Sequence, residues 1–294
     1  MPLTIALIMH PRGDAHRLEE LRSIVARLRA DGHVVRPHLT SGAGDATRLA
    51  REAARAGVDL VIAAGGDGTV NEVVNGIGRL QRPPRLGILP IGTGNDFALG
   101  LGIPQDLVEA TRVAVAGRPL AVDVARVNER LFVNVSTGGF GAEATEHTPD
   151  EAKRLLGPLA YLVTGAKELV ELRPTRARFA TDGRPYYDGE FLLFAVGNAR
   201  RTGGGSLLTP RAEFGDGQLD LLVVEAMPRL EFLALLPDLR AGTHLGSPGV
   251  RYTRAASIVV SPSGALAVNA DGEPVQATRY RYSICPRPLT VMVP

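Results

Sequence analysis

Two glycine-rich stretches carry the residue types best suited to chemistry in this chain. The first is GGDGT, residues 65–69, which follows the apolar run LVIAA, and the second is GTGND, residues 92–96, which follows LGILPI. Glycine lets the backbone approach a ligand without an intervening side chain, and free amides at a helix start favour phosphate. Both stretches therefore predict phosphate binding, and two tight turns without a ligand are the alternative.

The elements around these stretches alternate between buried strands and helices. Short apolar runs predict strands, and apolar residues at three- and four-residue spacing predict helices. The expected strands are 3–9, 34–39, 60–64 and 86–89, and the expected helices are 14–30, 45–56, one starting near Thr69, and 105–116. Such alternation is typical of a parallel sheet covered on both faces. Ligands bind beyond the carboxyl ends of such strands, and both glycine-rich stretches follow strand ends.

The pattern changes after residue 124, where strands follow one another with Gly, Pro and Asp-Gly pairs between them. The expected strands are 122–127, 131–136, 176–181, 186–196, 218–224, 257–261, 265–269, 279–285 and 289–293. We therefore predict an α/β plus β fold. An N-terminal α/β domain with a parallel sheet spans 1–124, and an antiparallel β-sandwich-like domain spans 125–294. The last strand is free to return to the first domain.

The composition argues against several classes of protein. A net charge of +2 over 294 residues gives no reason to expect nucleic acid as a partner. The single cysteine, Cys285, excludes an internal disulfide and favours the cytoplasm, and the histidines lack metal-ligand spacing. No apolar run approaches the roughly 18 to 20 residues that span a bilayer. We therefore expect a soluble, cytoplasmic protein.

The common nucleotide-binding motifs do not fit the glycine-rich stretches. GxxxxGK[ST] is absent, and the best match to GxGxxG, GTGNDF, ends in phenylalanine. Phosphate must then be held by backbone amides, hydroxyls, arginine and a divalent cation. Asp67 and Asp96 would repel a polyphosphate unless a cation or water lay between them, which favours magnesium.

At this point the residues resemble a known family. GGDGTVNE at 65–72 and PIGTGNDFA at 90–98 resemble the diacylglycerol kinase catalytic domain, and the resemblance extends to DGE at 271–273. Over nearly its full length the chain is similar to the compact bacterial lipid kinases related to diacylglycerol and sphingosine kinases. GGDGT alone is shared with NAD kinases, but the combination of motifs is more specific. The resemblance implies that the N-terminal α/β domain binds the nucleotide. It also implies an enzyme that transfers the γ-phosphoryl group of ATP to a lipid hydroxyl, such as that of diacylglycerol.

The resemblance also implies roles for individual residues. The ATP site would comprise Thr40, Gly65, Gly66, Asp67, Gly68, Thr69, Val70, Asn71, Thr93, Asn95 and Asp96. The proton acceptor would be Glu273, with Asp271 beside it, and on an extended chain the two would share one face. An exposed Asp-Gly hairpin turn is the alternative for this motif.

A magnesium site is also implied by the resemblance. It would consist of Asp216 and the main-chain oxygens of Glu213 and Gln218, and Asp123 would extend the same network. An oxygen-only set suits Mg²⁺. The sequence departs from the family pattern at Gly215, where a second acidic residue often stands, and this weakens the expected affinity for the metal.

Two leucine-rich segments, 155–172 and 230–239, are candidates for lining an acyl groove or docking on a bilayer. Burial of their apolar faces against the second domain is the alternative. Peripheral contact with the inner membrane surface is expected from a lipid substrate. Two other functions stay open: a kinase of a soluble hydroxyl, of the NAD kinase sort, and a nucleotide- or lipid-binding regulator without turnover. The sequence specifies neither the lipid acceptor nor the oligomeric state, a homodimer included.

Overall fold

A computed structural model describes residues 1–10, 15–140, 173–285 and 289–294 of the chain. The chain forms two compact units, one of Met1–Val122 with Arg287–Pro294 and one of Asp123–Pro286. The division falls two residues before the boundary expected after residue 124, and the end of the chain belongs to the unit that contains its beginning.

The first unit is built on a six-stranded sheet in the order β2-β1-β3-β4-β17-β5. The strands are β1 (Thr4–Met9), β2 (Val34–Leu39), β3 (Leu60–Gly65), β4 (Arg85–Pro90), β5 (Arg118–Val122) and β17 (Leu289–Val293). Neighbouring strands are parallel except β17 and β5, which are antiparallel. Every residue of β3 is buried, which explains its unbroken apolar sequence. Because β1 to β4 are parallel, their carboxyl ends lie at one edge of the sheet.

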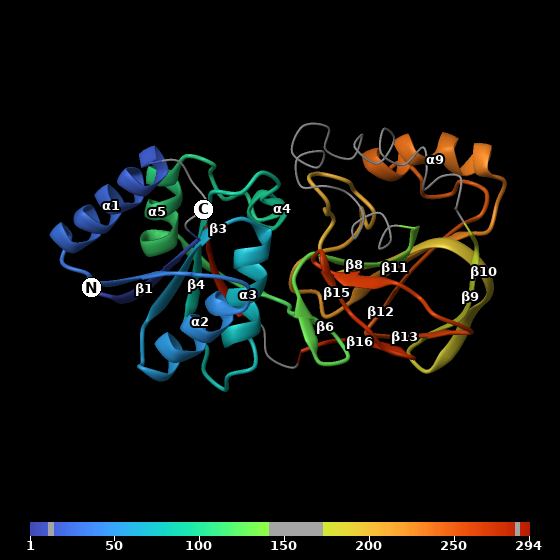
Figure 1. Cartoon of the computed structure of the whole chain (residues 1–294), viewed down its shortest axis with the longest axis horizontal. Coiled ribbons are helices and arrows are strands. Elements are labelled where there is room, and N and C mark those ends of the chain that lie inside the picture. Colours follow the sequence, from blue (N-terminus) through green and yellow to red (C-terminus); the bar gives the residue numbers. More distant parts are fainter. Residues whose placement is uncertain (11–14, 141–172, 286–288) are drawn as a thin grey trace. The chain divides into compact units, whose positions relative to one another are not determined.

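Helices cover both faces of this sheet (Figure 1). The helices are α1 (Ala15–Ala30), α2 (Asp45–Arg55), α3 (Asp67–Ile77), α4 (Asp96–Gly100) and α5 (Leu107–Ala116). Figure 1 shows α1 and α5 on one side of the sheet and α2 and α3 on the other. Gly76 lets α2 and α3 approach closely, since a Cβ there would lie 2.6 Å from the carbonyl oxygen of Thr47. The sequence did not predict α4, because five residues are too few to show a helical period.

The second unit contains an eleven-stranded sheet in which all paired strands are antiparallel. Its strands are β6 (Ala125–Val127), β7 (Arg130–Phe132), β8 (Val135–Gly139), β9 (Thr175–Thr181), β10 (Arg184–Gly197), β11 (Leu219–Glu225), β12 (Val250–Ala255), β13 (Ser257–Pro262), β14 (Val268–Ala270), β15 (Glu273–Pro274) and β16 (Tyr280–Ile284). The order is β15-β14-β8-β10-β9-β13-β16-β6-β7, and β11 pairs with β10 and β12. The predicted α/β plus β fold class is confirmed.

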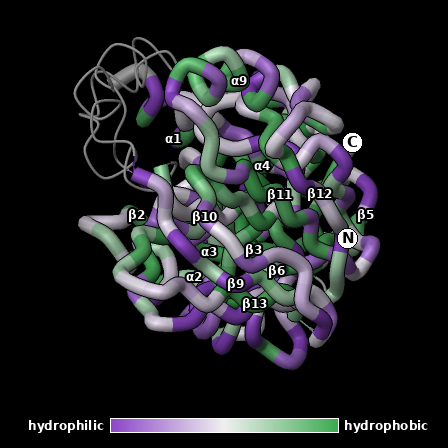
Figure 2. The backbone as a smooth tube through the Cα atoms, turned by 90° about the vertical axis from the view of Figure 1, so that its right-hand side faces the viewer, coloured by the Kyte–Doolittle hydropathy of each residue, from purple (hydrophilic) through white to green (hydrophobic). Residues whose placement is uncertain are grey.

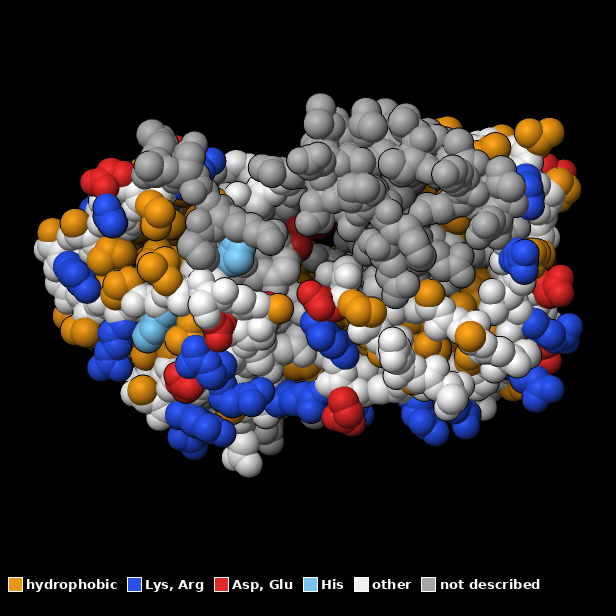
Figure 3. Space-filling model, in the orientation of Figure 1, with side chains coloured by type: hydrophobic (Ala, Val, Ile, Leu, Met, Phe, Trp, Pro, Cys, Tyr) orange, Lys and Arg blue, Asp and Glu red, His pale blue; other side chains and the backbone are white. Residues whose placement is uncertain are grey.

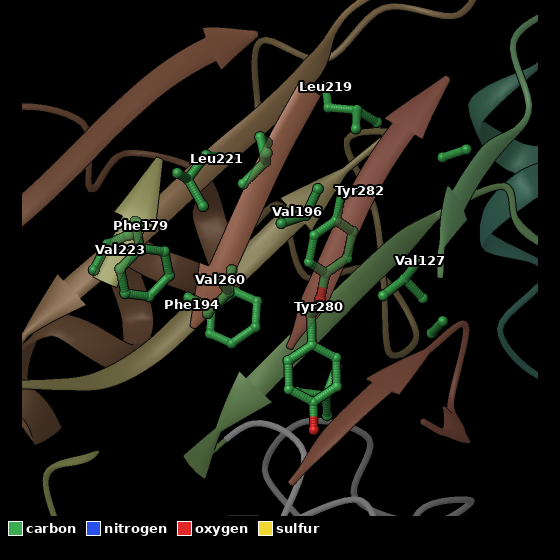
Figure 4. Packing of buried hydrophobic residues seen from close by; sticks show 14 of the residues in the cluster. Val127, Phe179, Phe194, Val196, Leu219, Leu221, Val223, Val260, Tyr280 and Tyr282 are labelled. Atoms are coloured by element: carbon green, nitrogen blue, oxygen red, sulfur yellow. The ribbon is translucent and has the colours of Figure 1, made fainter. Parts of the chain in front are cut away.

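Aromatic rings fill the core of the second unit (Figure 4). The rings of Phe179 and Phe194 meet edge to face with centroids 5.5 Å apart. Tyr282 is fully buried beside them, and its hydroxyl lies 3.1 Å from the Ser136 hydroxyl. Burial raises the pKa of Tyr282, so this pair is a neutral hydrogen bond inside the core. Coloured by hydropathy, the backbone is green mainly along interior strands and purple mainly at the periphery (Figure 2).

Two predicted strands are each divided in the structure. The segment 122–127 separates into β5 and β6, which belong to different units. The segment 131–136 separates into β7 and β8, because the amides of residues 133–135 are hydrogen-bonded to the carboxylate of Asp271 instead of continuing one ladder. The sequence also missed β12, whose arginines interrupt any apolar alternation.

The leucine-rich segment 230–239 lies in α9 (Arg229–Ala241). Phe232, Leu235 and Leu239 are buried against the sheet, as the alternative to lipid contact expected, whereas Leu230 remains 80% exposed. The other segment, 155–172, lies outside the described residues. Of the helices that the structure describes, none is both long and apolar enough to cross a membrane.

His244 is a fully buried histidine in the loop after α9. Its Nδ1 lies 3.3 Å from the carbonyl oxygen of Asp238. Burial lowers the pKa of His244, because a charged ring would lose its hydration. The pKa of His244 is thus lower in the folded chain than the unfolded value of 6.5. The contribution of the neutral His244 ring to the free energy of unfolding is therefore complete above pH 6.5, and it is lost as the pH falls through the pKa of the folded chain.

We expect the variant His244→Leu to flatten the acid-side fall of the unfolding midpoint between about pH 7 and 5, because it removes this proton linkage. Thermal unfolding across that pH range measures the slope, independently of any change in absolute stability. The matched control is His38→Gln, a half-buried histidine of β2, which should keep the wild-type slope. An unchanged slope in His244→Leu would contradict the prediction.

Candidate active site

The carboxyl edge of the first sheet brings together the ends of β1, β2, β3 and β4. The hydroxyl of Thr40, directly after β2, lies 2.9 Å from Nδ1 of His10, directly after β1. The amide of His10 in turn donates to the carbonyl of Ala64 in β3, at 3.2 Å. Sequence reasoning named Thr40 but missed His10, since a lone histidine after a strand carries no motif. Thr40 is only 4% exposed, so its hydroxyl is buried at the carboxyl edge of the sheet.

The two glycine-rich stretches touch through their backbones. A Cβ on Gly92 would lie 2.4 Å from Cα of Gly66, and a Cβ on Gly66 would lie 3.1 Å from Cα of Gly92. The side chain of Asn95 supports this contact, because its Nδ2 donates to the Gly92 carbonyl at 2.8 Å. Asn95 itself has a φ of 51°, in the left-handed region that asparagine tolerates. These glycines are therefore required for the close approach of the two loops.

Asp67 joins the same two loops by hydrogen bonds. Its Oδ2 accepts from the amide of Asp96 and its Oδ1 accepts from the amide of Phe97, both at 3.1 Å. These are the first amides of α4, which have no partner within their own helix. The charge of Asp67 is thus balanced by backbone dipoles, so the repulsion that led us to expect magnesium beside it is reduced.

Glu72, in the same motif, caps a different helix. Its carboxylate accepts from the amides of Gly44 and Ala46, each at 3.0 Å, and its carbonyl accepts from the Thr47 hydroxyl at 2.8 Å. These groups form the start of α2, which follows the Thr40 loop. Asp45, the first residue of α2, accepts from the amide of Ser41 at 2.8 Å. Glu72 therefore ties the loop after β2 to the helix after GGDGT.

We expect Glu72→Ala to lower the free energy of unfolding by about 1–3 kcal/mol, because it removes a charged helix cap and leaves two amides without an acceptor. Chemical denaturation followed by circular dichroism measures the change. Glu52→Ala is the matched control on α2, since Glu52 is exposed and pairs only on the surface with Arg48. Equal losses in the two variants would refute the capping role.

The start of α3 remains open. Its N-cap is Gly66, which has an extended conformation and no capping side chain, and Gly68 in the first turn is exposed. Among the described helices that follow strands at this edge, α2 and α4 have carboxylates on their first amides, whereas α3 has none. The first amides and the positive end of the dipole of α3 are consequently available to an anion.

The predicted nucleotide residues fall into two groups by exposure. Gly66, Asp67, Gly68, Thr69 and Thr93 are exposed or half-buried, whereas Thr40, Gly65, Val70, Asn71, Asn95 and Asp96 are buried. In this arrangement the first group can meet a ligand directly. The second group shapes the loops through packing and hydrogen bonds.

The DGE motif forms a hairpin turn. Asp271 and Gly272 have φ values of 50° and 84°, and Ala270 pairs with Glu273 across the turn from β14 to β15. This is the two-residue turn that Asp-Gly favours. The expectation that Asp271 and Glu273 share one face of an extended strand is therefore wrong, because both central residues of the turn have left-handed backbones.

The two carboxylates of this motif have different surroundings. Asp271 accepts hydrogen bonds from the amides of Val133, Asn134 and Val135, at 2.8 to 3.2 Å. The side chain of Glu273 is 49% exposed, and its Oε2 lies 3.6 Å from a guanidinium nitrogen of Arg130 in β7. Asp271 is thus bound within the second unit, whereas Glu273 presents its carboxylate to solvent. Arg130 was not anticipated from sequence, since it belongs to no motif.

The loop predicted to hold magnesium is already occupied by a cationic side chain. Asp216 accepts from the amide of Gln218 on Oδ1, at 2.9 Å, and its Oδ2 pairs with Arg254. Asp123 braces the loop by accepting from the amide of Gly217, at 2.7 Å. Within the described ranges, no group of three or more His, Cys, Asp or Glu side chains could hold a metal ion. The predicted set consists of the Asp216 carboxylate and the main-chain oxygens of Glu213 and Gln218. Because that carboxylate is paired with Arg254, the set does not favour a divalent cation in this arrangement.

An apolar groove of about 440 Å³ is lined by residues of α1, β1 and β2, among them Leu21, Val25 and Leu39. Figure 3 shows hydrophobic side chains gathered over this side of the first unit. The groove lies beside α1 and contains none of the predicted site residues. We assign no function to this groove, because nothing among the described residues shows what covers it.

The first unit thus has a mostly parallel sheet with two contacting glycine loops at its carboxyl edge, and the second unit has an antiparallel sheet. Residues 4–127 match the diacylglycerol kinase catalytic domain, and residues 134–293 match the YegS C-terminal NAD kinase beta sandwich-like domain. The chain belongs to the lipid kinase family that contains the diacylglycerol kinases and the YegS-like kinases, and it is a kinase.

Similar proteins extend over nearly the whole chain. A Chromohalobacter salexigens protein named "Probable lipid kinase YegS-like" is 39% identical over 96% of this chain and 91% of its own length. A Bacillus subtilis diacylglycerol kinase is 38% identical over 87% of this chain and 84% of its own length. A Bacillus anthracis diacylglycerol kinase structure matches with a TM-score of 0.77 and 27% identity, covering 99% and 97% of the chains. An Archaeoglobus fulgidus NAD kinase, with 13% identity and a TM-score of 0.55 over 98% and 93% of the chains, shares the fold alone.

Proposed function

We propose that this kinase transfers the γ-phosphoryl group of ATP to the hydroxyl of a lipid, with diacylglycerol as the first candidate. The observation that carries the proposal is the open start of α3 beside the contact between Gly66 and Gly92. An anion is stabilised there by free amides and by the helix dipole. The acceptor follows from the similar diacylglycerol kinase of Bacillus subtilis.

In this proposal the nucleotide phosphates bind the amides of Gly66 to Thr69. The hydroxyls of Thr69 and Thr93 are the side-chain donors nearest to solvent in the two loops. Asp67 and Asn95 hold the loops together and Glu72 fixes the neighbouring helix, so the phosphate site is formed before ATP arrives. ATP would enter as its magnesium complex, and the metal would supply charge neutralisation to the phosphate oxygens.

The lipid hydroxyl requires a base when it attacks the γ-phosphorus. We assign this role to Glu273, because its carboxylate is exposed and close to only one cation, Arg130, among the ion pairs of the described residues. A guanidinium nitrogen of Arg130 lies 3.6 Å from Oε2 of this carboxylate. Asp271, which the resemblance placed in the catalytic pair, fixes the turn that presents Glu273, since its oxygens accept from three backbone amides.

A panel of acceptors tests the function. The purified kinase is incubated with labelled MgATP and, separately, diacylglycerol, phosphatidylglycerol, a sphingoid base, ceramide or NAD, with lipids in mixed micelles and in vesicles. Phosphorylation of diacylglycerol above the other acceptors supports the proposal. Phosphorylation of NAD alone would make the chain a kinase of a soluble hydroxyl, and ATP binding without transfer to any acceptor would make it a regulator. Vesicle sedimentation in the same assay tests peripheral contact with an anionic, inner-leaflet-like membrane, which a cytoplasmic lipid kinase requires.

A further inference from the structure

Arg254 lies between two carboxylates in the second unit. Its guanidinium pairs with Oδ2 of Asp216, and its Nε lies 3.6 Å from Oδ2 of Asp220. Asp220 and Arg254 are directly opposite each other in the ladder between β11 and β12. We call Asp216, Asp220 and Arg254 the arginine cluster. It joins the loop before β11 to the neighbouring strand.

The two carboxylates of the cluster are largely withdrawn from water, whereas the side chain of Arg254 is 35% exposed. The side chain of Asp220 is 0% exposed, and that of Asp216 is 19% exposed. Tyr252 donates to Oδ1 of Asp220 at 2.7 Å, and Oδ2 has no hydrogen-bond donor among the described residues. A buried carboxylate without a partner is strongly unfavourable. Arg254 is the cation in ion-pair distance of both acids.

A divalent ion in the same place would meet three obstacles. One Asp216 oxygen accepts from the Gln218 amide, and the other faces the guanidinium. A second acidic residue, which would raise the affinity for Mg²⁺, is replaced by Gly215. The fixed positive charge of Arg254 would also repel Mg²⁺. Arginine, by contrast, offers several donors in a fixed plane and is weakly hydrated, which suits a pair of partly buried carboxylates.

We propose that Arg254 is the built-in cation of the loop Glu213–Gln218 and takes the place of a divalent metal ion there. The arginine cluster then holds the loop from the side of β12, while Asp123 holds it through the amide of Gly217, at 2.7 Å. The second unit consequently needs no metal to keep this loop in place. This inference concerns the folded second unit and does not depend on which acceptor the kinase uses.

Thermal unfolding without nucleotide tests the inference apart from activity. For the wild-type chain, we expect the midpoint in EDTA and in about 5 mM MgCl₂, at matched ionic strength, to agree within roughly 1 °C, because no metal binds this loop. For Arg254→Gln in EDTA, we expect a midpoint lower by roughly 5 °C or more, because the fully buried Asp220 and the mostly buried Asp216 lose their cation. We expect MgCl₂ to restore much of that loss, since the freed oxygens then form a set that Mg²⁺ prefers.

Three further variants make the result specific. Adding Asp216→Asn to Arg254→Gln should abolish the recovery by MgCl₂. Arg254→Lys, which keeps a charge but not the planar fork, should lose less than Arg254→Gln and serves if the glutamine variant does not fold. Arg178→Gln is the matched control, because Arg178 is an 80% exposed partner of Asp188 in the same unit, and its midpoint should stay within roughly 2 °C of wild type.

The opposite results would overturn the inference. A wild-type midpoint that rises in MgCl₂, and fails to rise in Asp216→Asn, would show that the metal and not the arginine occupies the loop. An Arg254→Gln variant as stable as the Arg178→Gln control, or one that MgCl₂ does not restore, would show that Arg254 does not act in place of a cation.

Discussion

Glu273→Gln is expected to lower the rate of phosphoryl transfer by about 10²- to 10⁴-fold, with the fold and ATP binding retained. The amide keeps the size of the side chain but cannot accept the proton of the attacking hydroxyl. The side chain is 49% exposed and its one ion pair among the described residues, with Arg130, is long, so its charge contributes little to stability. Initial rates with saturating ATP and lipid, together with thermal unfolding, measure the two effects separately.

Two control variants distinguish the proposed general base, Glu273, from Asp271, which holds the turn. Glu190→Gln, an exposed glutamate on β10 of the same unit, should keep wild-type turnover. Asp271→Asn should instead lower the free energy of unfolding by about 1–3 kcal/mol, because an amide nitrogen would face backbone donors that now meet a carboxylate. Near-normal turnover in Glu273→Gln, combined with a stable but inactive Asp271→Asn, would transfer the base assignment to Asp271.

Gly92→Ala is expected to weaken ATP binding by roughly 10²-fold, because it separates the two glycine loops. The new Cβ would lie 2.4 Å from Cα of Gly66 and 2.8 Å from Oδ1 of Asn95. No side-chain rotation relieves a contact between two backbones, so one loop must move and the amides at the start of α3 move with it. Overpacking of this kind also costs about 1–3 kcal/mol of stability. Calorimetric titration with ATP and chemical denaturation measure both quantities.

The matched control for this variant is Gly42→Ala. Gly42 lies in the loop after β2 at the same sheet edge, and a Cβ there would have no atom within 4 Å. ATP affinity and stability should therefore stay close to wild type. If Gly92→Ala binds ATP as tightly as Gly42→Ala does, the contact between the loops is not part of the nucleotide site.

The sequence by itself determined the class of fold and the family. The unbroken apolar run of β3 and the helical periods around it predicted a parallel sheet, because such strands are buried on both faces. The short strands and Asp-Gly turns after residue 124 predicted the antiparallel unit for a similarly local reason. Hydrophobic period and turn chemistry are properties of neighbouring residues, so they can be recognised without knowing the packing.

Only the tertiary structure decided what the acidic residues of the motifs contact. Asp67 was expected around bound phosphate, yet its carboxylate accepts from two amides of α4. Glu72 of the same motif accepts from two amides at the start of α2. These partners lie 26 to 30 positions away in the sequence and are brought together by the order of the strands. Asp271 reaches amides of residues 133–135, and Asp216 meets Arg254 on a strand that the sequence did not predict. A carboxylate accepts equally well from a phosphate-bound metal, an arginine or a helix start. Which of these it meets depends on chain segments far apart in sequence, and the local pattern does not contain that information.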